Sequence, residues 1–226
     1  MLPTPTTVKV NVVPTTLIFT GPPVPLVNPS LDVVIPVRLI FPTPIIFFEI
    51  RNDLIEYIYN EKENDPKGLK QSNEGGWHSS YEIHKKNDFV KYYEFMMKNI
   101  NQSIDIYFKS GVVFTMKDCW ANINSKGDEN KLHCHPNNDI SGCFWIKSPD
   151  KSSCLSYLNP EHFAHDKLLY SLKENIKQKY FITSELTTTP TEGYIALFPS
   201  NLMHRVLKNN SDEHRISIAF NIQFNN

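Results

Sequence analysis

The feature that most constrains the fold is a change of hydrophobic period at Gly111. Beyond it the chain is a series of short segments rich in β-branched and aromatic residues, bounded by Gly, Pro, Asn and Asp. They read VVFTMKDCWANIN, SGCFWIKSP, CLSYLNP, YFITSELTTTP, EGYIALFPS and HRISIAFNIQF. Such a series predicts at least six strands of an antiparallel sheet or sandwich. The segment HDKLLYSLKENIKQK interrupts it and is expected to be a helical insertion.

Two amphipathic helices are predicted before these strands. The first is RNDLIEYIYNEK, with Asn52 or Asp53 as its cap. The second starts at Asn87 or Asp88, and its apolar residues recur three or four apart over about five turns, which indicates a core face. That face consists of Phe89, Tyr93, Met96, Met97, Ile100, Ile104 and Tyr107. Helices followed by strands indicate an α+β, mainly β domain in which helices cover one face of the sheet.

The N-terminal region differs in composition, because ten of the sixteen prolines lie in the first 48 residues. Proline blocks helices and removes backbone donors, so extended chain or edge strands are expected. Residues 1–30 are predicted to be a Pro-rich extension. Residues 31–226 are predicted to be one domain, with helical support over 50–110 and a β core over 111–226.

Charge and cysteine content exclude some classes of protein. The 23 basic and 24 acidic residues nearly cancel, so no global field favours nucleic acid or a membrane surface. No apolar run reaches the roughly 18 residues that a membrane span needs. The four cysteines form no CxxC pair, which favours free thiols and a cytoplasmic location, in a host cytoplasm if the protein is viral. They are Cys119, Cys134, Cys143 and Cys154.

The histidines of NKLHCHPNNDISGCFWI are the first candidates for chemistry. If this stretch is extended, His133 and His135 project to one side, as two metal ligands require, while Cys134 points away. His204, in GYIALFPSNLMHRV, could be the third ligand. Imidazole suits iron, zinc, copper and nickel. A His-x-His pair is common on surface loops, but the order of these histidines, with Arg215 eleven residues after His204, favours a site.

This ordered set resembles the 2-oxoglutarate (2OG) and Fe(II)-dependent oxygenases, within a phage and bacterial branch. The resemblance covers residues 41–221 and rests on FPTP, SNEGGWHSS, CWANINSKGDENKLHCHPNNDISGCFWI and GYIALFPSNLMHRVLKNNSDEHRISIAFN. Prolyl-hydroxylase-like members carry His-x-Asp, a distal His and Arg-x-Ser. His133, His204, Arg215 and Ser217 match this pattern. The resemblance implies a double-stranded β-helix, a cupin-like jelly-roll barrel, and Fe(II) and 2OG as cofactors.

One position departs from the family pattern, because His135 stands where the family usually has Asp. The common facial triad is two His and one carboxylate. Three-histidine iron sites exist, and the branch often shows His-x-His, so His135 is kept as the third ligand. The alternative is that Asp139 supplies the carboxylate.

The resemblance also implies residues that bind the cosubstrate. Arg215 would grip the far carboxylate of 2OG through its planar fork, and Ser217, two residues along the same strand, would donate to it. The alternative for Arg215 is a surface ion pair with Asp212 or Glu213. Asn122 and Asn124, in WANIN, are candidate hydrogen-bond partners of 2OG, or strand-end residues.

Other aromatic and histidine side chains are given structural roles. Trp120, Phe144 and Trp145 are expected in the core or the wall of a pocket. His78 could lie near the mouth of a substrate site or stabilise its loop. The remaining histidines are expected on the surface: His84, His162, His165 and His214.

The activity implied by the resemblance is hydroxylation of a substrate C–H bond with O2, while 2OG is split to succinate and CO2. The substrate could be a protein side chain or a small molecule, since no basic-aromatic signature of nucleic-acid binding is present. Two other classes remain open. One is a non-catalytic jelly-roll binding module that has lost iron. The other is a zinc hydrolase, which would leave Arg215 and Ser217 without a role.

Overall fold

The computed structural model describes residues 41–44, 51–160, 167, 169–180 and 183–225. Its elements, in chain order, are β1 (Phe41–Pro44), α1 (Arg51–Asn64), β2 (Asn73–Glu74), β3 (Trp77–His78), two 3-10 turns (Ile83–Lys85 and Asn87–Phe89), α2 (Val90–Tyr107), β4 (Val113–Asn124), β5 (Glu129–His133), β6 (Ile140–Lys147), β7 (Leu155–Leu158), α4 (Glu174–Tyr180), β8 (Glu185–Thr188), β9 (Tyr194–Pro199), β10 (His204–Val206) and β11 (Arg215–Asn225).

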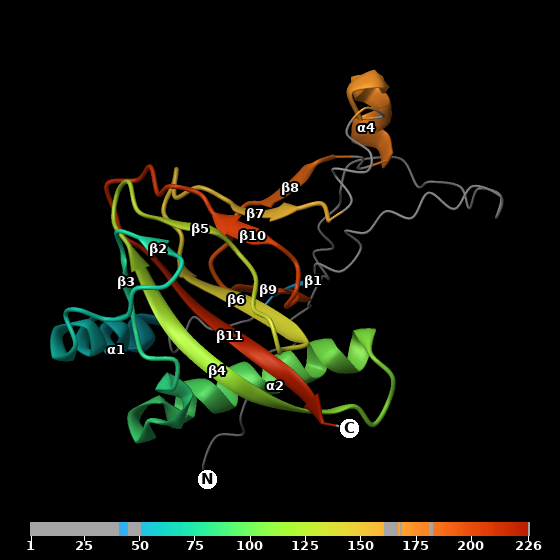
Figure 1. The fold of residues 1–226 in the computed structure, drawn as a ribbon. Helices are drawn as coiled ribbons and strands as arrows, with labels where there is room; N and C mark the ends of the chain where they lie inside the picture. The colour runs from blue at the N-terminus through green and yellow to red at the C-terminus, as the bar shows by residue number, and fades with distance from the viewer. Residues whose placement is uncertain (1–40, 45–50, 161–166, 168, 181–182, 226) are drawn as a thin grey trace, which may run out of the picture.

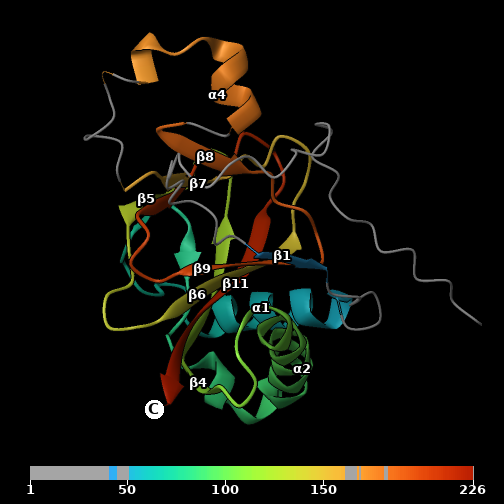
Figure 2. The same cartoon turned by 90° about the vertical axis from the view of Figure 1, so that its right-hand side faces the viewer.

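The strands form two antiparallel sheets that face each other (Figure 1). The six-stranded sheet has the order β1-β9-β6-β11-β4-β3, and the five-stranded sheet has the order β2-β5-β10-β7-β8. Figure 2 shows α1 and α2 lying across the outer face of the larger sheet, on the side away from β7 and β8. The domain is therefore a helix-backed β-sandwich, which agrees with the predicted mainly β class.

The two long strands β4 and β11 organise the larger sheet. Their pairing runs from Arg215↔Asn124 to Asn225↔Val113, with one irregularity between Asn221 and Ile222. On its other side β11 pairs with β6. Because side chains alternate along a strand, β11 sends successive residues to opposite faces of the sheet.

The outer face of this sheet is apolar and forms the main core. It presents Ile216, Ile218 and Phe220 of β11, which are all fully buried. The helices pack their apolar faces against it, and the buried helical residues are Leu54, Ile58, Tyr92, Met96, Ile100 and Ile104. Burying one such aliphatic side chain contributes about 1.5–3 kcal/mol. This face therefore supplies most of the driving force for folding.

Both predicted helices are present, with small differences at their ends. The first helix extends to Asn64, beyond the predicted segment. The second begins at Val90 after a 3-10 turn over Asn87–Phe89. Of its predicted face, four residues are buried and two are partly buried, and the side chain of Tyr107 lies outside the described residues. The four are Phe89, Met96, Ile100 and Ile104, and the two are Tyr93 and Met97.

The structure adds short strands before Gly111 to the predicted ones. β1 precedes α1, in the Pro-rich region where edge strands were expected, and the predicted loop between the helices contains β2 and β3. Two-residue strands are too short to show a period, so sequence pattern cannot reveal them. The turn between β2 and β3 consists of Gly75 and Gly76, whose φ angles are +68° and +55°. A Cβ on Gly76 would lie 2.7 Å from the amide nitrogen of Asn124.

The Pro-rich N-terminal region and the predicted helical insertion can also be compared with the structure. β1 pairs with β9 at the edge of the larger sheet although it contains two prolines, as expected of an edge strand. Residues 1–40 lie outside the described residues, so the division at residue 30 stays a prediction. The expected helical insertion contains α4, which projects from the sandwich (Figure 1).

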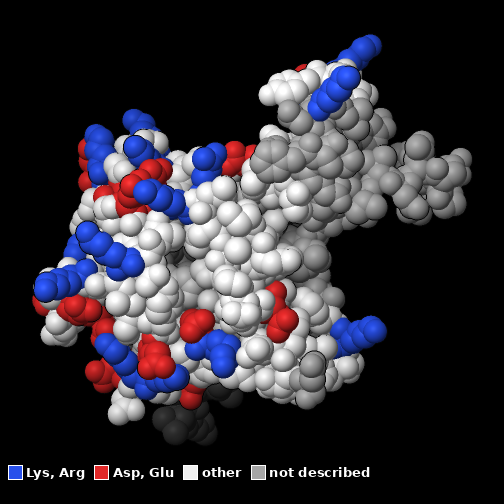
Figure 3. All heavy atoms as spheres, viewed as in Figure 1, with Lys and Arg blue, Asp and Glu red and all other residues white. Residues whose placement is uncertain are grey.

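None of the helices in the described part of the chain has the length and hydropathy of a membrane span. On the face in Figure 3, basic and acidic side chains intermix along one edge, while the centre of the face is mostly uncharged. No single-sign patch dominates this view, in agreement with a net charge of −1.

Candidate metal centre

Three histidines meet between the two sheets. His133, the last residue of β5, lies directly opposite His204, the first residue of β10. His135 follows β5 by two residues, and its ring centroid lies 5.0 Å from that of His133 and 5.1 Å from that of His204. One nitrogen from each ring lies within 4.8 Å of the others. Strand pairing thus brings together side chains that are far apart in sequence.

Backbone hydrogen bonds orient two of these rings. Nδ1 of His133 lies 2.6 Å from the carbonyl of Lys131, and Nδ1 of His204 lies 2.8 Å from the carbonyl of Leu202. A carbonyl only accepts, so each Nδ1 donates and each Nε2 keeps its lone pair. Such partners fix the tautomer that binds a metal.

The Nε2 atoms of His135 and His204 are 3.3 Å apart. Two nitrogens bound at right angles to one metal, each about 2.1 Å from it, would lie about 3 Å apart. The observed spacing is close to this value. The arrangement therefore fits one divalent ion held by three imidazoles.

Burial keeps the cluster neutral. Burial, with the neighbouring histidines adding to it, lowers the pKa of His204 to about 3 and that of His135 to about 4. Burial also lowers the pKa of His133. Neutral imidazole is the form that binds metal, so at neutral pH the site needs to release no proton.

A buried polar network holds the segment of His135 in place. The backbone N–H of His135 donates to the carbonyl of Ser200 at 2.8 Å. The Ser200 hydroxyl lies 2.8 Å from the hydroxyl of Ser141, which donates to Asn221 Oδ1 at 2.8 Å. Asn221 in turn donates to Asp118 at 3.0 Å. The position that departs from the family pattern is thus anchored to strands β4, β6 and β11.

The structure does not support Asp139 as a ligand. Its carboxylate accepts the backbone N–H of Phe224 at 2.8 Å, and its own N–H donates to Ile222, so it is tied to the end of β11. Among the described residues, the His/Cys/Asp/Glu group that could hold a metal contains the three histidines. Cys134 lines the adjacent cavity but is not part of this group.

The histidines open onto a cavity of about 460 Å³ between the sheets. Of the predicted cosubstrate residues, Asn122, Asn124 and Ser217 line its wall, whereas Arg215 is not among its lining residues. Asn122 is paired with Ser217, and Asn124 with Arg215, across β4 and β11, so all four lie on the inner face of the larger sheet.

Arg215 is fully buried, which excludes the surface ion pair considered from the sequence. Asp212 pairs with Lys126 instead, and Glu213 pairs with Lys147. Nη1 of Arg215 donates to the carbonyls of Ser152 and Leu207, but Nε and Nη2 have no hydrogen-bond partner among the described residues. A buried cation with two donors unpaired among the described residues favours the binding of an anion.

Cys143 lies close to both the cavity and Arg215. It lines the cavity, and burial raises the pKa of its thiol to about 12, while a hydrogen bond with Ser217 and the charge of Arg215 act in the opposite direction. Arg215 is therefore near the part of the cavity lined by Cys143 and Ser217.

Sequence reasoning missed Tyr157. This side chain is fully buried on β7, opposite His204, and its hydroxyl makes no hydrogen bond of ordinary geometry within the described residues, although Thr188 lies near it. Burial, followed by the proximity of Cys143, holds the pKa of its phenol well above the usual range. Tyr157 is thus a neutral donor near the same group of residues. The segment CLSYLNP reads as an ordinary strand, so the sequence carried no signal for it.

The sequence predicts for His78 either a place near the mouth of a substrate site or a role in stabilising its loop. In the structure His78 lies in the cavity wall. It lies opposite Asn122 on β3 and is 2% exposed. Its ring stacks on Trp120 with centroids 5.5 Å apart, and its Nδ1 lies 2.6 Å from the carbonyl of Ser79. Tyr81 packs edge-on against both rings. This aromatic group forms one side of the cavity, next to the metal ligands.

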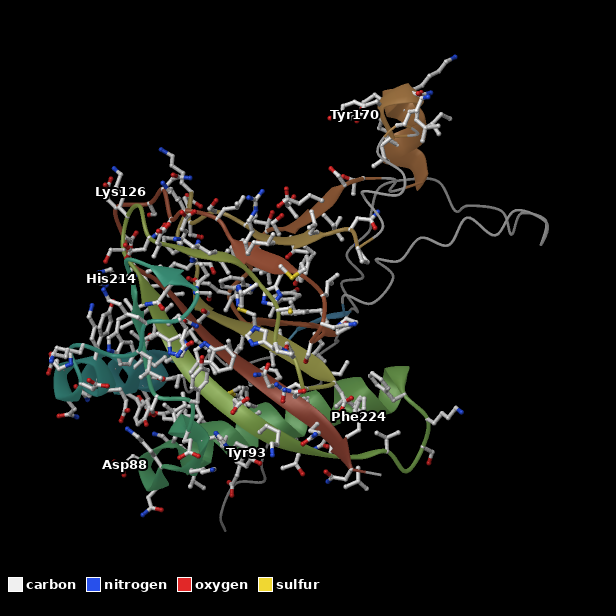
Figure 4. The ribbon with its side chains drawn as sticks, in the orientation of Figure 1. Asp88, Tyr93, Lys126, Tyr170, His214 and Phe224 are labelled. Carbon is white, nitrogen blue, oxygen red and sulfur yellow. The ribbon has the colours of Figure 1, made fainter. Side chains whose placement is uncertain are left out.

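The structure also places the remaining aromatic residues and two of the remaining histidines. Trp120 lines the cavity, and Phe144 and Trp145 belong to the two buried clusters, as expected. His214 lies at the edge of the domain, where Nδ1 meets the hydroxyl of Tyr59 at 2.8 Å (Figure 4). His84 is half-buried against Tyr93. His162 and His165 lie outside the described residues.

Comparisons with known proteins agree with this geometry. Residues 118–221 match the family described as "Putative 2OG-Fe(II) oxygenase". The structure resembles a Pseudomonas putida prolyl-4-hydroxylase, with a TM-score of 0.56 and 11% identity over 81% of this chain and 92% of that chain. It also resembles the non-heme alpha ketoglutarate dependent epimerase SnoN from nogalamycin biosynthesis, with a TM-score of 0.60 and 8% identity over 81% and 78%.

A third solved structure is HygX from Streptomyces hygroscopicus with nickel and 2-oxoglutarate bound, with a TM-score of 0.53 and 9% identity over 81% of this chain and 82% of that chain. No curated protein sequence matches the chain. At these identities the solved structures establish the fold alone. They confirm the predicted double-stranded β-helix.

The family match covers all three histidines, Arg215 and Ser217. Residues 118–221 match the model of the 2OG-Fe(II) oxygenase family, which confirms the resemblance drawn from the sequence. Fold and family match together point to a 2OG-dependent oxygenase, an oxidoreductase, and the cofactors of the family are Fe(II) and 2OG. The phage-like branch stays a prediction.

Proposed function

We propose that this protein hydroxylates a protein side chain or a small molecule, with His133, His135 and His204 as the iron ligands. In the same reaction 2OG is split to succinate and CO2. Two groups in the same barrel support the proposal, because each has the geometry to bind a ligand. Three neutral imidazoles converge on one point, and a buried guanidinium on the inner face of the same sheet has two donors that lack a partner among the described residues.

The residues fit the implied cofactors. Nε2 atoms of the three histidines would hold Fe(II), because Nδ1 of two of them is already bonded to backbone carbonyls. When bound, iron and 2OG supply the oxidising power with O2, and that chemistry belongs to the cofactors rather than to the protein. The protein contributes a fixed set of ligands, an anchor for the cosubstrate and a shielded cavity.

Arg215 would take the far carboxylate of 2OG through Nε and Nη2. These two nitrogens form one edge of the guanidinium, which matches the two oxygens of a carboxylate. Ser217 and the hydroxyl of Tyr157 are neutral donors that could add to this grip. An anion bound here would also offset the free-energy cost of burying an unpaired cation.

The aromatic residues Trp120, Tyr81 and Phe198 would keep bulk water from the metal, since they form the cavity wall beside the histidines. His78 would accept a hydrogen bond through Nε2, because its Nδ1 is directed to Ser79. A substrate that enters between the sheets would meet this side of the cavity. These roles use only side chains that line the space next to the ligands.

Stepwise ligand binding tests the proposal. Under anaerobic conditions Fe(II) should raise the melting temperature, and 2OG should raise it further only when metal is present, since ligands that bind the native state stabilise it. Admission of O2 should then release succinate in an amount that depends on both cofactors. A folded protein whose melting temperature responds to neither Fe(II) nor 2OG would refute the proposal.

A further inference from the structure

We propose that the cavity binds a second anion beside the metal, in addition to 2OG, so that the substrate carries a carboxylate or phosphate near its reacting carbon. The inference rests on the proposed function and deepens it by naming the chemical class of the substrate. It follows from a count of the charges that surround the cavity.

The ligand set contributes no negative charge. His133, His135 and His204 are neutral when they bind a metal. None of the residues that line the cavity, within the described part of the chain, is Asp or Glu. The one charged lining residue is Lys131, at the mouth, and its ammonium pairs with Glu74 at 2.5 Å.

Acidic residues elsewhere in the barrel are already engaged. Asp118 accepts a hydrogen bond from Asn221, and Asp128 accepts the backbone N–H of Ser125 at 2.7 Å. Glu185 binds the exposed Arg205 through two bonds of 2.9 Å on the outer side of β8 and β10. None of these carboxylates lines the cavity, and the charge of Asp128 acts on Arg215 rather than on the histidine cluster.

The net charge of the groups that would touch the bound ligands is positive. Among these groups a divalent metal contributes +2 and Arg215 contributes +1, while 2OG contributes −2, which leaves +1; Asp128 acts on Arg215 but does not line the cavity. In the usual triad a carboxylate at the position of His135 would bring the sum to zero. Because opposite charges attract more strongly in a buried, low-dielectric site than in water, the remaining charge favours a further anion.

The cavity has room and donors for that anion. Its volume of about 460 Å³ is in the range that holds a drug-sized ligand, which is larger than a five-carbon diacid. The side chains of Gln71, Ser72 and Asn130 line it near the mouth and carry N–H or O–H groups. A substrate could therefore place its anionic group near the metal and be held at its other end by neutral donors.

The test compares two small probes that differ in charge. The full chain, loaded anaerobically with Fe(II) and saturating 2OG, is titrated with acetate or with acetamide, and binding is followed by calorimetry and by the visible charge-transfer band of bound 2OG. We expect acetate to bind at least tenfold more tightly than acetamide while the band persists. Equal affinities, or loss of the band because acetate displaces 2OG, would overturn the proposal.

Two variants locate the source of the preference. His135→Asp, which supplies the missing negative charge, should reduce the preference for acetate to less than threefold. Lys131→Gln should leave it intact. A preference that survives His135→Asp in metal-loaded protein, or that disappears in Lys131→Gln, contradicts the charge count. If His135→Asp binds no metal, the acetate and acetamide comparison in the unaltered protein still decides the matter.

The source of the anion is tested with methyl phosphate and chloride. A substrate group predicts that methyl phosphate competes with acetate more effectively than chloride does. If chloride alone competes, the site takes an inorganic ion and the substrate assignment is wrong. Failure of the proposed function is distinguishable, because then neither Fe(II) nor 2OG would bind before any probe is added.

Discussion

The two faces of the six-stranded sheet differ although they are built from the same strands. On the outer face, Ile216 and Ile218 of β11 are fully buried in the same hydrophobic cluster as the helical residues. On the inner face, Arg215 and Ser217 look toward the second sheet, and a cavity remains. Alternate residues of one strand therefore serve stability and ligand binding separately.

Unmet hydrogen bonds show the same division. Of the seven buried side-chain atoms without a partner among the described residues, four belong to Asn122, Tyr157 and Arg215, on the inner side. Each such atom costs about 1–3 kcal/mol. The helix side contributes fewer such atoms, namely the Tyr57 hydroxyl and His84 Nδ1, because most of its side chains are apolar. The difference teaches that the inner face is adapted to a ligand at the expense of stability.

The largest expected effect is on metal binding. His204→Ala should abolish stoichiometric Fe(II) binding, because only the imidazoles of His133 and His135 then remain, and two ligands hold the ion less tightly than three. The measurement is metal content after anaerobic dialysis, with circular dichroism to check the fold. His214→Ala is the matched control, since that histidine bonds to Tyr59 at the edge of the domain. Full iron occupancy in His204→Ala would remove it from the ligand set.

The next effect is on stability and tests the outer face. Ile218→Ala should lower the free energy of unfolding by about 3 kcal/mol, as cavity formation in a packed core does. Ser217→Ala, one residue away on the inner face, should change it by less than about 1 kcal/mol and should instead weaken 2OG binding. Chemical denaturation measures both. Equal losses of stability would show that the two faces are not separate.

A smaller effect concerns the cosubstrate. Arg215→Met should keep Fe(II) binding but weaken 2OG binding at least tenfold, about 1.4 kcal/mol. Arg205→Met is the control, because Arg205 faces outward and is bound to Glu185. Calorimetry of the metal-loaded proteins compares them. An unchanged 2OG affinity in Arg215→Met would assign the guanidinium to holding Ser152 and Leu207.

Sequence reasoning succeeded where a pattern repeats over a whole element. The apolar period of α2 and the β-branched runs of β4 and β11 are long enough to define their type. The three histidines and Arg215 could be proposed because the order of these residue types is specific to the family. In each case the signal was local, or was contained in a motif.

It failed where position depends on pairing between distant segments. β5 is ENKLH, whose one apolar residue is Leu132, and β10 is only His204–Val206, so neither shows a strand period. Both strands exist because they pair with each other, and that pairing creates the histidine cluster. Tyr157 and His78 enter the site in the same way, through register with His204 and Asn122.

The most direct measurement is an anaerobic titration of the protein with Fe(II) and then with 2OG, followed by the visible charge-transfer band of the chelated cosubstrate. We predict that the band appears with one equivalent of each in the unaltered protein and in Arg205→Met. It should be absent in His204→Ala, and it should require at least tenfold more 2OG in Arg215→Met. A folded protein that binds no Fe(II), or whose band is unaffected by Arg215→Met, would contradict the proposed site.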